Sequence, residues 1–300
     1  MTLSSHSSSP GVSRDITQPD RREDRRALVN VVIPWRLVPL VLLLTAVSVL
    51  PAILSSPTTQ SLADRLTPPF GFGGTGLGTD GLGRDLLARI ITGTRNSLAI
   101  SIVAATGASL LGITAGVLAG MLGGWADRIV ELLVESVLAI PFITVGLMVT
   151  ATIGQSTTSM LLLLIGTGWI THAQILRAQA RMVSQAEYVI AASAMGASKA
   201  HIARRHLVPN LLPISIVVYF QQIGSMLLWS ASLTWLGIGA PIEQISLGGI
   251  VRDGQDLLYN GWWVSLFAGL AIIYVVTSLN LAADWLRIVI DPVQKGHRPL

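Results

Sequence analysis

Side chains able to make ionic contacts with a partner gather in one stretch of the chain. Its five cations are Arg177, Arg181, Lys199, Arg204 and Arg205. Hydrophobic runs flank the stretch on both sides, and each is long enough to cross a membrane. Placing such a cation at the centre of a bilayer costs about 2.5–3.5 kcal/mol on translocon-type scales. The stretch is therefore expected in water, on the cytoplasmic side.

Small and apolar residues inside this stretch recur at helical spacing. Positions i, i+3, i+4 and i+7 of one face are Tyr188, Ala191, Ala192 and Met195. Gly196 follows where a left-handed C-terminal cap is expected, and Ser198 is placed to cap a second short helix. Pro209 is expected to begin a new segment. The pattern predicts a helix, a glycine turn and another helix, with short side chains suited to insertion into a groove of another subunit.

The stretch resembles the cytoplasmic EAA loop of permease subunits in bacterial ABC importers. Ala191, Ala192, Gly196 and Pro209 match that pattern, whereas its Glu, Ile and Leu positions hold Ile190, His206 and Val208. The resemblance implies a coupling helix that seats in an ATPase and transmits its closure. The residues assigned to this contact are Glu187, Tyr188, Ala191, Ala192, Met195, Gly196, Arg204 and Arg205.

Two further phrases look like the dipeptide/oligopeptide/nickel branch of these permeases, in particular its second, shorter subunit. The first joins Gly78-Thr79-Asp80 to Gly83-Arg84-Asp85, and the second runs from Asn280 through Asp284 and Arg287 to Asp291-Pro292. Ser230 stands where the family usually has an acidic residue, which puts any charge-based role there in doubt.

This resemblance implies a bacterial inner-membrane subunit that moves peptides or related small solutes through half of a pore. The implied partners are a second, homologous permease, two cytoplasmic ABC ATPases that bind ATP and Mg²⁺, an extracytoplasmic solute-binding protein and the lipid bilayer. We expect no cofactor, metal or nucleic acid in this chain and no catalysis by it. His172, His201 and His206 lack metal-ligand spacing with any carboxylate, and the chain has no cysteine.

The elements that must position these residues are membrane helices, because 51% of the chain is hydrophobic and only 12% is charged. A window of about twenty residues finds six apolar segments, at 35–55, 98–120, 128–150, 158–178, 209–236 and 263–286. We therefore expect an all-α integral membrane fold of six spans. With both termini cytoplasmic, fifteen arginines and lysines lie inside and five outside, in accord with the positive-inside rule.

The predicted organisation has a disordered tail, an anchor span, an outer loop and a helical core. The expected bounds are 1–34 for the tail, 35–55 for the anchor, 56–97 for the loop, 98–290 for a five-helix core with the coupling loop at 180–208, and 291–300 for a cytoplasmic tail. In the outer loop Asp80 is expected to cap a helix lying in the membrane interface, with Leu86 and Ile90 on its apolar face and Arg89 facing away.

Polar residues inside the spans are candidates for the pore or its gate, because polar groups at membrane depth need partners or water. The candidates are Gln221, Gln222, Ser225, Glu135, Asn280 and Asp284. The glutamines are equally compatible with hydrogen bonds to a neighbouring helix. For Glu131 and Glu135 a structural ion pair with Arg128 or a loop arginine is favoured, and anchoring at the interface is an alternative role for Asn280 and Asp284.

Small residues follow the second span at every fourth position and include Gly112, Gly116 and Gly120, which predicts close approach of another helix. Pro141 is expected to kink the third span. A proton-coupled secondary transporter, a solute channel and a membrane-bound enzyme are the alternatives. The first would need an ionisable relay at mid-membrane, the asymmetric basic loop disfavours the second, and the third would need a clustered acid, base or metal set.

Overall fold

The computed structural model describes residues 21–54, 56–70, 76–239, 241 and 244–290. Regular structure in this part is helical apart from one isolated bridge between Thr79 and Asp85, which confirms the all-helical class. The chain forms two units, Met1–Trp35 and Arg36–Leu300. The described part of the first unit is the beginning of helix α1, Arg21–Val49.

Helix α1 begins within the segment 1–34 that was predicted to be disordered. Arginine, glutamate, alanine and leucine follow Arg21 in the sequence, and these are good helix formers. The helix ends at Val49 and a short 3₁₀ turn, Leu50–Ala52, follows with Pro51 in it. Residues 1–20 of the predicted tail 1–34 and the predicted segment 291–300 lie outside the described residues.

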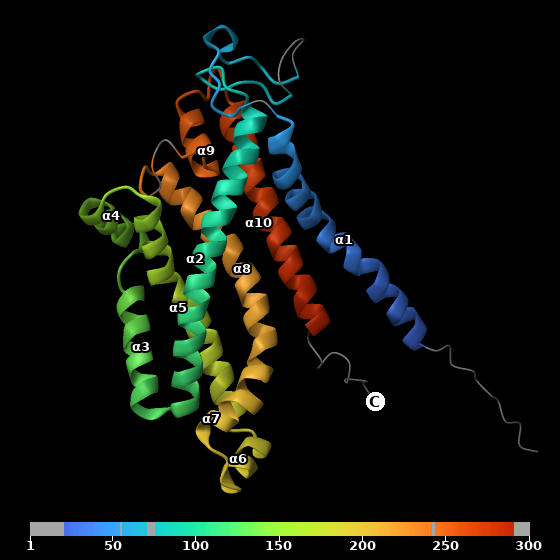
Figure 1. Ribbon diagram of the computed structural model, residues 1–300, viewed down its shortest axis with the longest axis vertical. Coiled ribbons are helices and arrows are strands. Elements are labelled where there is room, and N and C mark those ends of the chain that lie inside the picture. The colour runs from blue at the N-terminus through green and yellow to red at the C-terminus, as the bar shows by residue number, and fades with distance from the viewer. Residues whose placement is uncertain (1–20, 55, 71–75, 240, 242–243, 291–300) are drawn as a thin grey trace, which may run out of the picture. The chain divides into compact units, whose positions relative to one another are not determined.

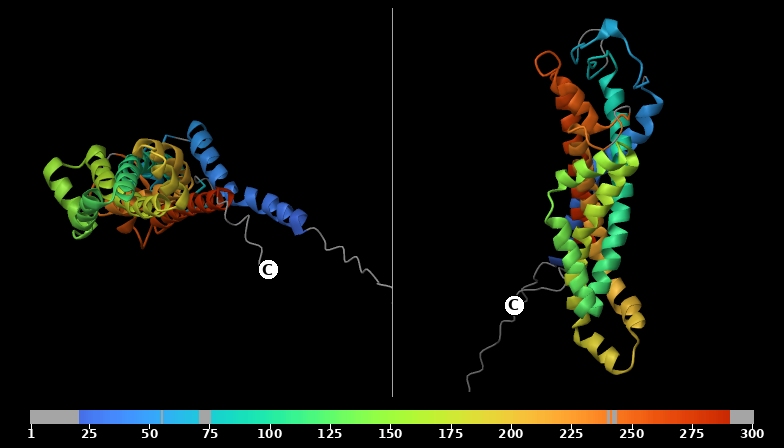
Figure 2. Two further views of the ribbon diagram at one scale, coloured as in Figure 1. Left: turned by 90° about the horizontal axis from the view of Figure 1, so that it is seen from below. Right: turned by 90° about the vertical axis from the view of Figure 1, so that its left-hand side faces the viewer.

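Four long helices of the second unit run side by side, as Figures 1 and 2 show. They are α2 (Leu86–Leu122), α5 (Thr157–Ser184), α8 (Val208–Trp235) and α10 (Trp263–Ile290). The largest apolar core lies among them and includes Ala104, Leu164, Leu227 and Val275, together with Leu43 of α1. Burial of such side chains is the main source of their mutual packing energy.

Each of the four helices is long and apolar enough to cross a membrane. Helices α3 (Gly124–Leu138) and α4 (Phe142–Ile153) supply a fifth candidate span if they are taken together. The apolar part of α1, Trp35–Val49, is shorter. The described residues thus contain four or five candidate spans, and the count of six stays a prediction.

The predicted third span is two helices instead of one kinked helix. Helices α3 and α4 meet at 83°, with Pro141 at the N-terminus of α4. Proline has no backbone N–H to donate and its ring collides with the preceding turn, so a break at this residue is expected. The break lies at the predicted position, but the bend is far sharper than a kink.

The small-residue rib of α2 packs against α5 of the same chain. A Cβ atom at Gly112, Gly116 or Gly120 would lie 2.3, 2.7 or 2.5 Å from the carbonyl oxygens of Trp169, Ala173 and Arg177, respectively. Those three carbonyls also follow one another at every fourth residue. The predicted close approach of a helix is therefore confirmed, and its partner is the backbone of α5.

The predicted interfacial helix at the beginning of α2 is wrong as a separate element. Helix α2 begins at Leu86 and continues without interruption into the apolar span. Its cap is Asp85, whose carboxylate accepts from the N–H groups of Leu87 and Ala88, whereas Asp80 lies in the preceding loop. Arg89, expected to point away from the apolar face of that helix, is buried, with 4% of it exposed.

Candidate functional site

The two short helices between α5 and α8 form a hairpin at one end of the second unit, which we call the coupling hairpin (residues 186–207; Figure 1). Its helices are α6, Glu187–Ala194, and α7, Lys199–Ile202. Gly196 has φ +88°, and the N–H of Ala197 donates to the carbonyl of Ala192 at 3.1 Å. Ser198 caps α7 by accepting from the N–H of His201 at 3.3 Å. Both predicted caps are confirmed.

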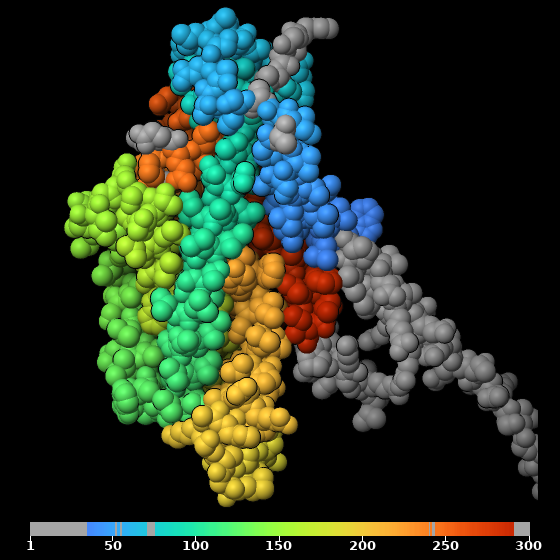
Figure 3. All heavy atoms as spheres, viewed as in Figure 1, coloured from blue at the N-terminus to red at the C-terminus, as the bar shows by residue number. Residues whose placement is uncertain are grey.

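The coupling hairpin is anchored by a few apolar side chains and exposes the others. Val189, Ile202 and Leu207 are buried in a small cluster with side chains of α5 and α8. Tyr188 and Met195 are 49% and 84% exposed. Of the other residues assigned to partner contact, Ala192 is half-buried, while Glu187, Ala191, Gly196, Arg204 and Arg205 are exposed. Figure 3 shows the hairpin as the yellow group that extends beyond the long helices.

The hairpin joins α8 without the break predicted at Pro209. Residues 199–235 form one continuous helix that contains a π-helical turn at Ala203–Leu207. In that turn the N–H of Val208 donates to the carbonyl of Ala203. Proline at 209 and 213 removes two further backbone donors, and Asn210 donates its side-chain N–H to the carbonyl of His206 at 2.6 Å. The helix therefore has fewer regular backbone hydrogen bonds where the hairpin continues into α8.

Ion pairs join α5 to α3 near the hairpin. The guanidinium of Arg177 donates to the carboxylate of Asp127 at 2.9 Å and lies 3.4 Å from Glu131. Arg128 pairs with the same Glu131 at 3.4 Å, so a structural ion pair at Glu131 is confirmed. Glu135 has no ion pair among the described residues. Asp127 was not predicted from the sequence as a partner of Arg177. Its position next to the predicted segment 128–150 could have indicated it, because carboxylates are favoured at the beginning of a helix.

A cavity of about 450 Å³ lies beside α5 and α8 at the corner between α3 and α4. Gln221, Gln222 and Ser225 are among its lining residues. Its other lining residues are Val137, Leu138, Ile140, Pro141, Phe142, Leu164, Thr167, Gly168, Ile170, Thr171, Ile175, Val218, Met226 and Trp229. Glu135, Asn280 and Asp284 are not among them, so the structure does not bring the six candidates together.

The two glutamines of α8 differ in their surroundings. Gln222 is buried, donates to the carbonyl of Gly168 on α5 at 2.7 Å, and accepts from Ser109 of α2 at 3.3 Å. Gln221 is exposed and its side chain has no hydrogen bond within the described part of the chain. Gln222 therefore hydrogen-bonds neighbouring helices, which was one of the two predicted alternatives. The side chain of Gln221 is available to the cavity.

Asn280 and Asp284 lie on α10, away from the cavity. Both are exposed, and the side-chain oxygen of Asn280 lies beside Gly224 of α8, 3.8 Å from where a Cβ would be. Their gating and anchoring roles stay predictions.

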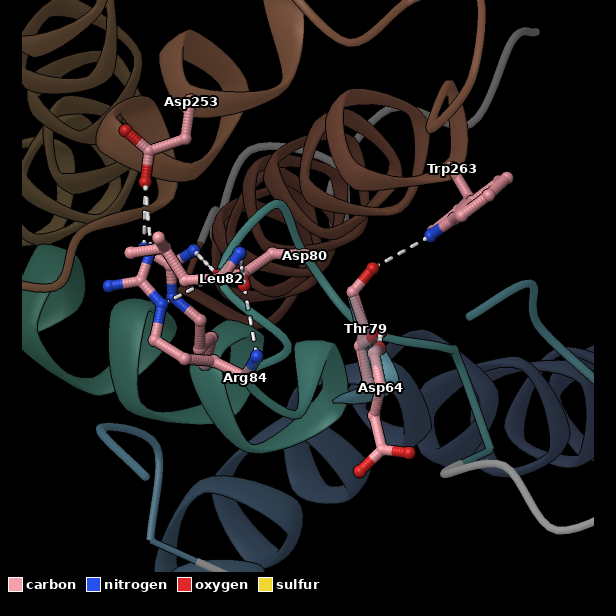
Figure 4. A network of polar contacts seen from close by, with 8 residues as sticks. Asp64, Thr79, Asp80, Leu82, Arg84, Asp253 and Trp263 are labelled. Carbon is pink, nitrogen blue, oxygen red and sulfur yellow. Dashed lines mark hydrogen bonds and ion pairs between the residues drawn. The ribbon is translucent and has the colours of Figure 1, made fainter. Parts of the chain in front are cut away.

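At the opposite end of the unit from the hairpin, four charged residues form what we call the Asp80 network (Asp80, Arg84, Arg89 and Asp253; Figure 4). The carboxylate of Asp80 accepts from the guanidinium of Arg89 and from Nε of Arg84, the latter at 2.7 Å. Arg89 also donates to Asp253 on α9 (Leu247–Gln255) at 2.8 Å. The network fastens the beginning of α2 to α9.

Burial by itself would raise the pKa of Asp80. The backbone N–H groups of Arg84 and Leu82, followed by the charge of Arg89 and the side chain of Arg84, outweigh burial and hold that pKa below its ordinary value of 3.8. The carboxylate is therefore ionised at neutral pH. Its neighbour Thr79 accepts at its carbonyl from the indole N–H of Trp263 at 3.0 Å.

Within the described residues, no group of three or more His, Asp or Glu side chains is placed to hold a metal ion. The cavity lining likewise contains no carboxylate, imidazole or amine. The described residues thus form a cavity with a neutral lining and, at one end of the unit, an exposed hairpin.

Comparisons with known proteins agree with this arrangement. Residues 112–295 match the family described as "Binding-protein-dependent transport system inner membrane component". The "Probable D,D-dipeptide transport system permease protein" of Escherichia coli K12 is 33% identical over 81% of this chain and 80% of its own length. The dipeptide permease of Alkalihalophilus pseudofirmus is 32% identical (73% and 72% covered), and the oligopeptide permease of Mycobacterium bovis 31% identical (74% and 77% covered).

The predicted resemblance is thereby confirmed at the level of the family. The apolar helices, the cavity beside α8 and the protruding hairpin belong to a transport permease. The chain is a member of the family of inner-membrane components of binding-protein-dependent transport systems.

Proposed function

We propose that this chain is a permease subunit of an ATP-driven importer of peptides or related small solutes, and that its coupling hairpin docks in a cytoplasmic ATPase. The observation that carries the proposal is the exposed apolar face of the hairpin, with Tyr188 and Met195 on it and Arg204 and Arg205 nearby. A short helix that exposes apolar side chains suits a groove on a partner. The peptide class is supported by the names of the relatives.

The hairpin is connected to both helices that border the cavity. Helix α5 enters it through residue 185, and α8 leaves it through the π-helical turn at Ala203–Leu207. A pull on the hairpin is therefore passed to the walls of the cavity. For ATP hydrolysis to drive this movement, the docking contact must differ in free energy between two conformations.

In the proposed assembly the other half of the pore comes from a second, homologous permease, and a solute-binding protein delivers the cargo. Two ATPase subunits bind ATP and Mg²⁺ and hydrolyse the nucleotide. This chain supplies one wall of the path and one docking hairpin, and it lies in the bacterial inner membrane with both termini in the cytoplasm.

The test is Met195→Arg in the reconstituted complex, because Met195 is 84% exposed and its replacement leaves the core untouched. We expect membrane insertion to be unchanged and ATP-dependent uptake to fall at least about tenfold, as for a contact near the centre of an interface. Met182→Arg is the matched control, since Met182 is also exposed but lies on α5 outside the hairpin. Unchanged uptake in Met195→Arg would contradict the docking role.

A further inference from the structure

The cavity beside α8 carries hydrogen-bonding side chains of one kind. All of them are neutral, namely Thr167, Thr171, Gln221, Gln222 and Ser225, and no ionisable side chain is among its described lining residues. A second cavity, of about 690 Å³ at the Asp80 network, has the opposite character, with Asp80, Arg84, Arg89, Arg252, Asp253 and Asp256 in its wall. Of these two cavities, only the one at the Asp80 network has charged side chains among its described lining residues.

Helix α8 directs a stripe of three side chains toward the neutral cavity. Gln221, Ser225 and Trp229 are spaced four residues apart and all are exposed. The hydroxyl of Ser225 donates to the carbonyl of Gln221 at 3.2 Å and keeps its acceptor capacity. The carboxamide of Gln221, which is free among the described residues, offers two donor hydrogens and an acceptor oxygen.

An aromatic pair bounds the stripe. The rings of Trp229 and Phe142 lie 4.5 Å apart, where Pro141 separates α3 from α4. Gln222 also lines the cavity, but its amide group is already hydrogen-bonded to Gly168 and Ser109. Gln221 therefore sits between an apolar wall and a satisfied neighbour, in a cavity whose volume lies in the range of small-molecule sites.

We propose that Gln221 and Ser225 bind backbone amide groups of the transported peptide, so that this wall of the path accepts peptides regardless of side-chain charge. The inference rests on the proposed function. A peptide bond presents one donor and one acceptor, which a carboxamide and a hydroxyl both satisfy without a net charge. A fixed charge in this wall would instead favour cargo of the opposite sign.

The experiment uses the complete importer in proteoliposomes with its own binding protein. Uptake is measured for three peptides of equal length that differ in one Lys, Gln or Glu residue, each at a concentration that saturates the binding protein. The wild type should transport the three at similar rates. Gln221→Glu should raise the ratio of Lys-peptide to Glu-peptide uptake on the order of tenfold, whereas Gln221→Leu should slow all three equally.

A matched pair of serines on α8 completes the design. Ser225 and Ser232 are both exposed and both donate to the carbonyl four residues earlier, but only Ser225 lines the cavity. Ser225→Ala should slow uptake of every peptide about threefold, the loss of one neutral hydrogen bond, and Ser232→Ala should leave it unchanged.

An unchanged ratio in Gln221→Glu, or strong charge discrimination by the wild type, would overturn the inference while leaving an active peptide importer. Absence of ATP-dependent uptake of any peptide by the wild-type complex would overturn the proposed function, and the inference with it. ATPase stimulation by the loaded binding protein, measured alongside, separates a blocked path from a lost coupling contact.

Discussion

At the scale of single residues, Arg89 is the centre of the Asp80 network. It is 4% exposed and connects Asp80, in the loop before α2, with Asp253 on α9. Asp253 lies 164 positions after Arg89 in the chain. Asp80 is 1% exposed and also accepts from Arg84 and from two backbone N–H groups, so it keeps partners when Arg89 is removed. Arg89 itself contributes charge-assisted hydrogen bonds to two carboxylates.

Arg89→Met is therefore expected to lower the free energy of unfolding by about 1.5–3 kcal/mol, because Asp80 keeps Arg84 as a partner. Arg95→Met is the control on the same helix, because Arg95 is exposed and has no ion pair in the described part of the chain. Thermal unfolding of the purified proteins in nanodiscs, followed by the loss of monodisperse protein, measures the difference. Equal midpoints for the two variants would contradict this role.

The lowered pKa of Asp80 predicts a pH dependence of stability. Because the folded state holds the carboxylate ionised below its ordinary pKa of 3.8, its contribution is present above about pH 4 and is lost as the pH falls through the folded pKa. The stability difference between the wild type and Asp80→Asn should thus be constant from neutral pH down to about pH 5 and shrink on further acidification. Denaturant unfolding at a series of pH values measures it, and a constant difference at all pH values would refute it.

At the scale of elements, the contact between α2 and α5 depends on the absence of side chains. The glycine rib places backbone against backbone at three successive turns, and Gly112 leaves room for the Cβ of His172. Such close approach is how helices gain dispersion energy in a membrane, where apolar side chains gain nothing by leaving lipid. The rib thus explains how α2 packs on α5 within this chain.

Gly116→Ala is expected to reduce the amount of folded protein, because the new Cβ would lie 2.7 Å from the carbonyl oxygen of Ala173 and the helices must move apart. Gly166→Ala is the matched control on α5, where a Cβ meets no atom within 4 Å. Alanine is the better helix former by about 1 kcal/mol, so the control should be neutral or stabilising. Detergent-resistant, monodisperse yield distinguishes the two, and a normal yield of Gly116→Ala would disprove the packing argument.

At the scale of the whole molecule, the coupling hairpin and the Asp80 network lie at opposite ends of the second unit. The positive-inside rule predicts a cytoplasmic position for the hairpin from its basic residues. The loop that carries the Asp80 network then faces the other side of the membrane.

The absence of cysteine makes this orientation testable by single-cysteine labelling. A membrane-impermeant maleimide should label Tyr259→Cys in intact spheroplasts, because Tyr259 is 99% exposed and lies beyond α9. Met195→Cys, produced without the ATPase, should be labelled after the membrane is opened and not before. The reverse pattern would invert the topology and remove the docking role of the hairpin.

Local features of this protein were determined by its sequence alone. Helical spacing, the left-handed cap at Gly196, the Ser198 cap and the break at Pro141 depend on a few neighbouring residues, whose conformational limits are properties of their own backbones. The same holds for the glycine rib and for the motif of the hairpin, and the hairpin motif together with the segment 78–85 indicates the family. Competition between nearby capping groups was harder to predict, since Asp80 and Asp85 are both suited to begin a helix.

Only the tertiary structure decided which distant groups meet. In the tertiary structure Gln222 is hydrogen-bonded to α5, whereas Gln221 is available to the cavity. The glycine rib packs against α5, and Asp253 lies beside Arg89. Adjacent residues on a helix point about 100° apart, so which one faces a cavity depends on the rotation of the helix against its neighbours. That rotation is set by the packing of all the helices at once, and no short segment contains it.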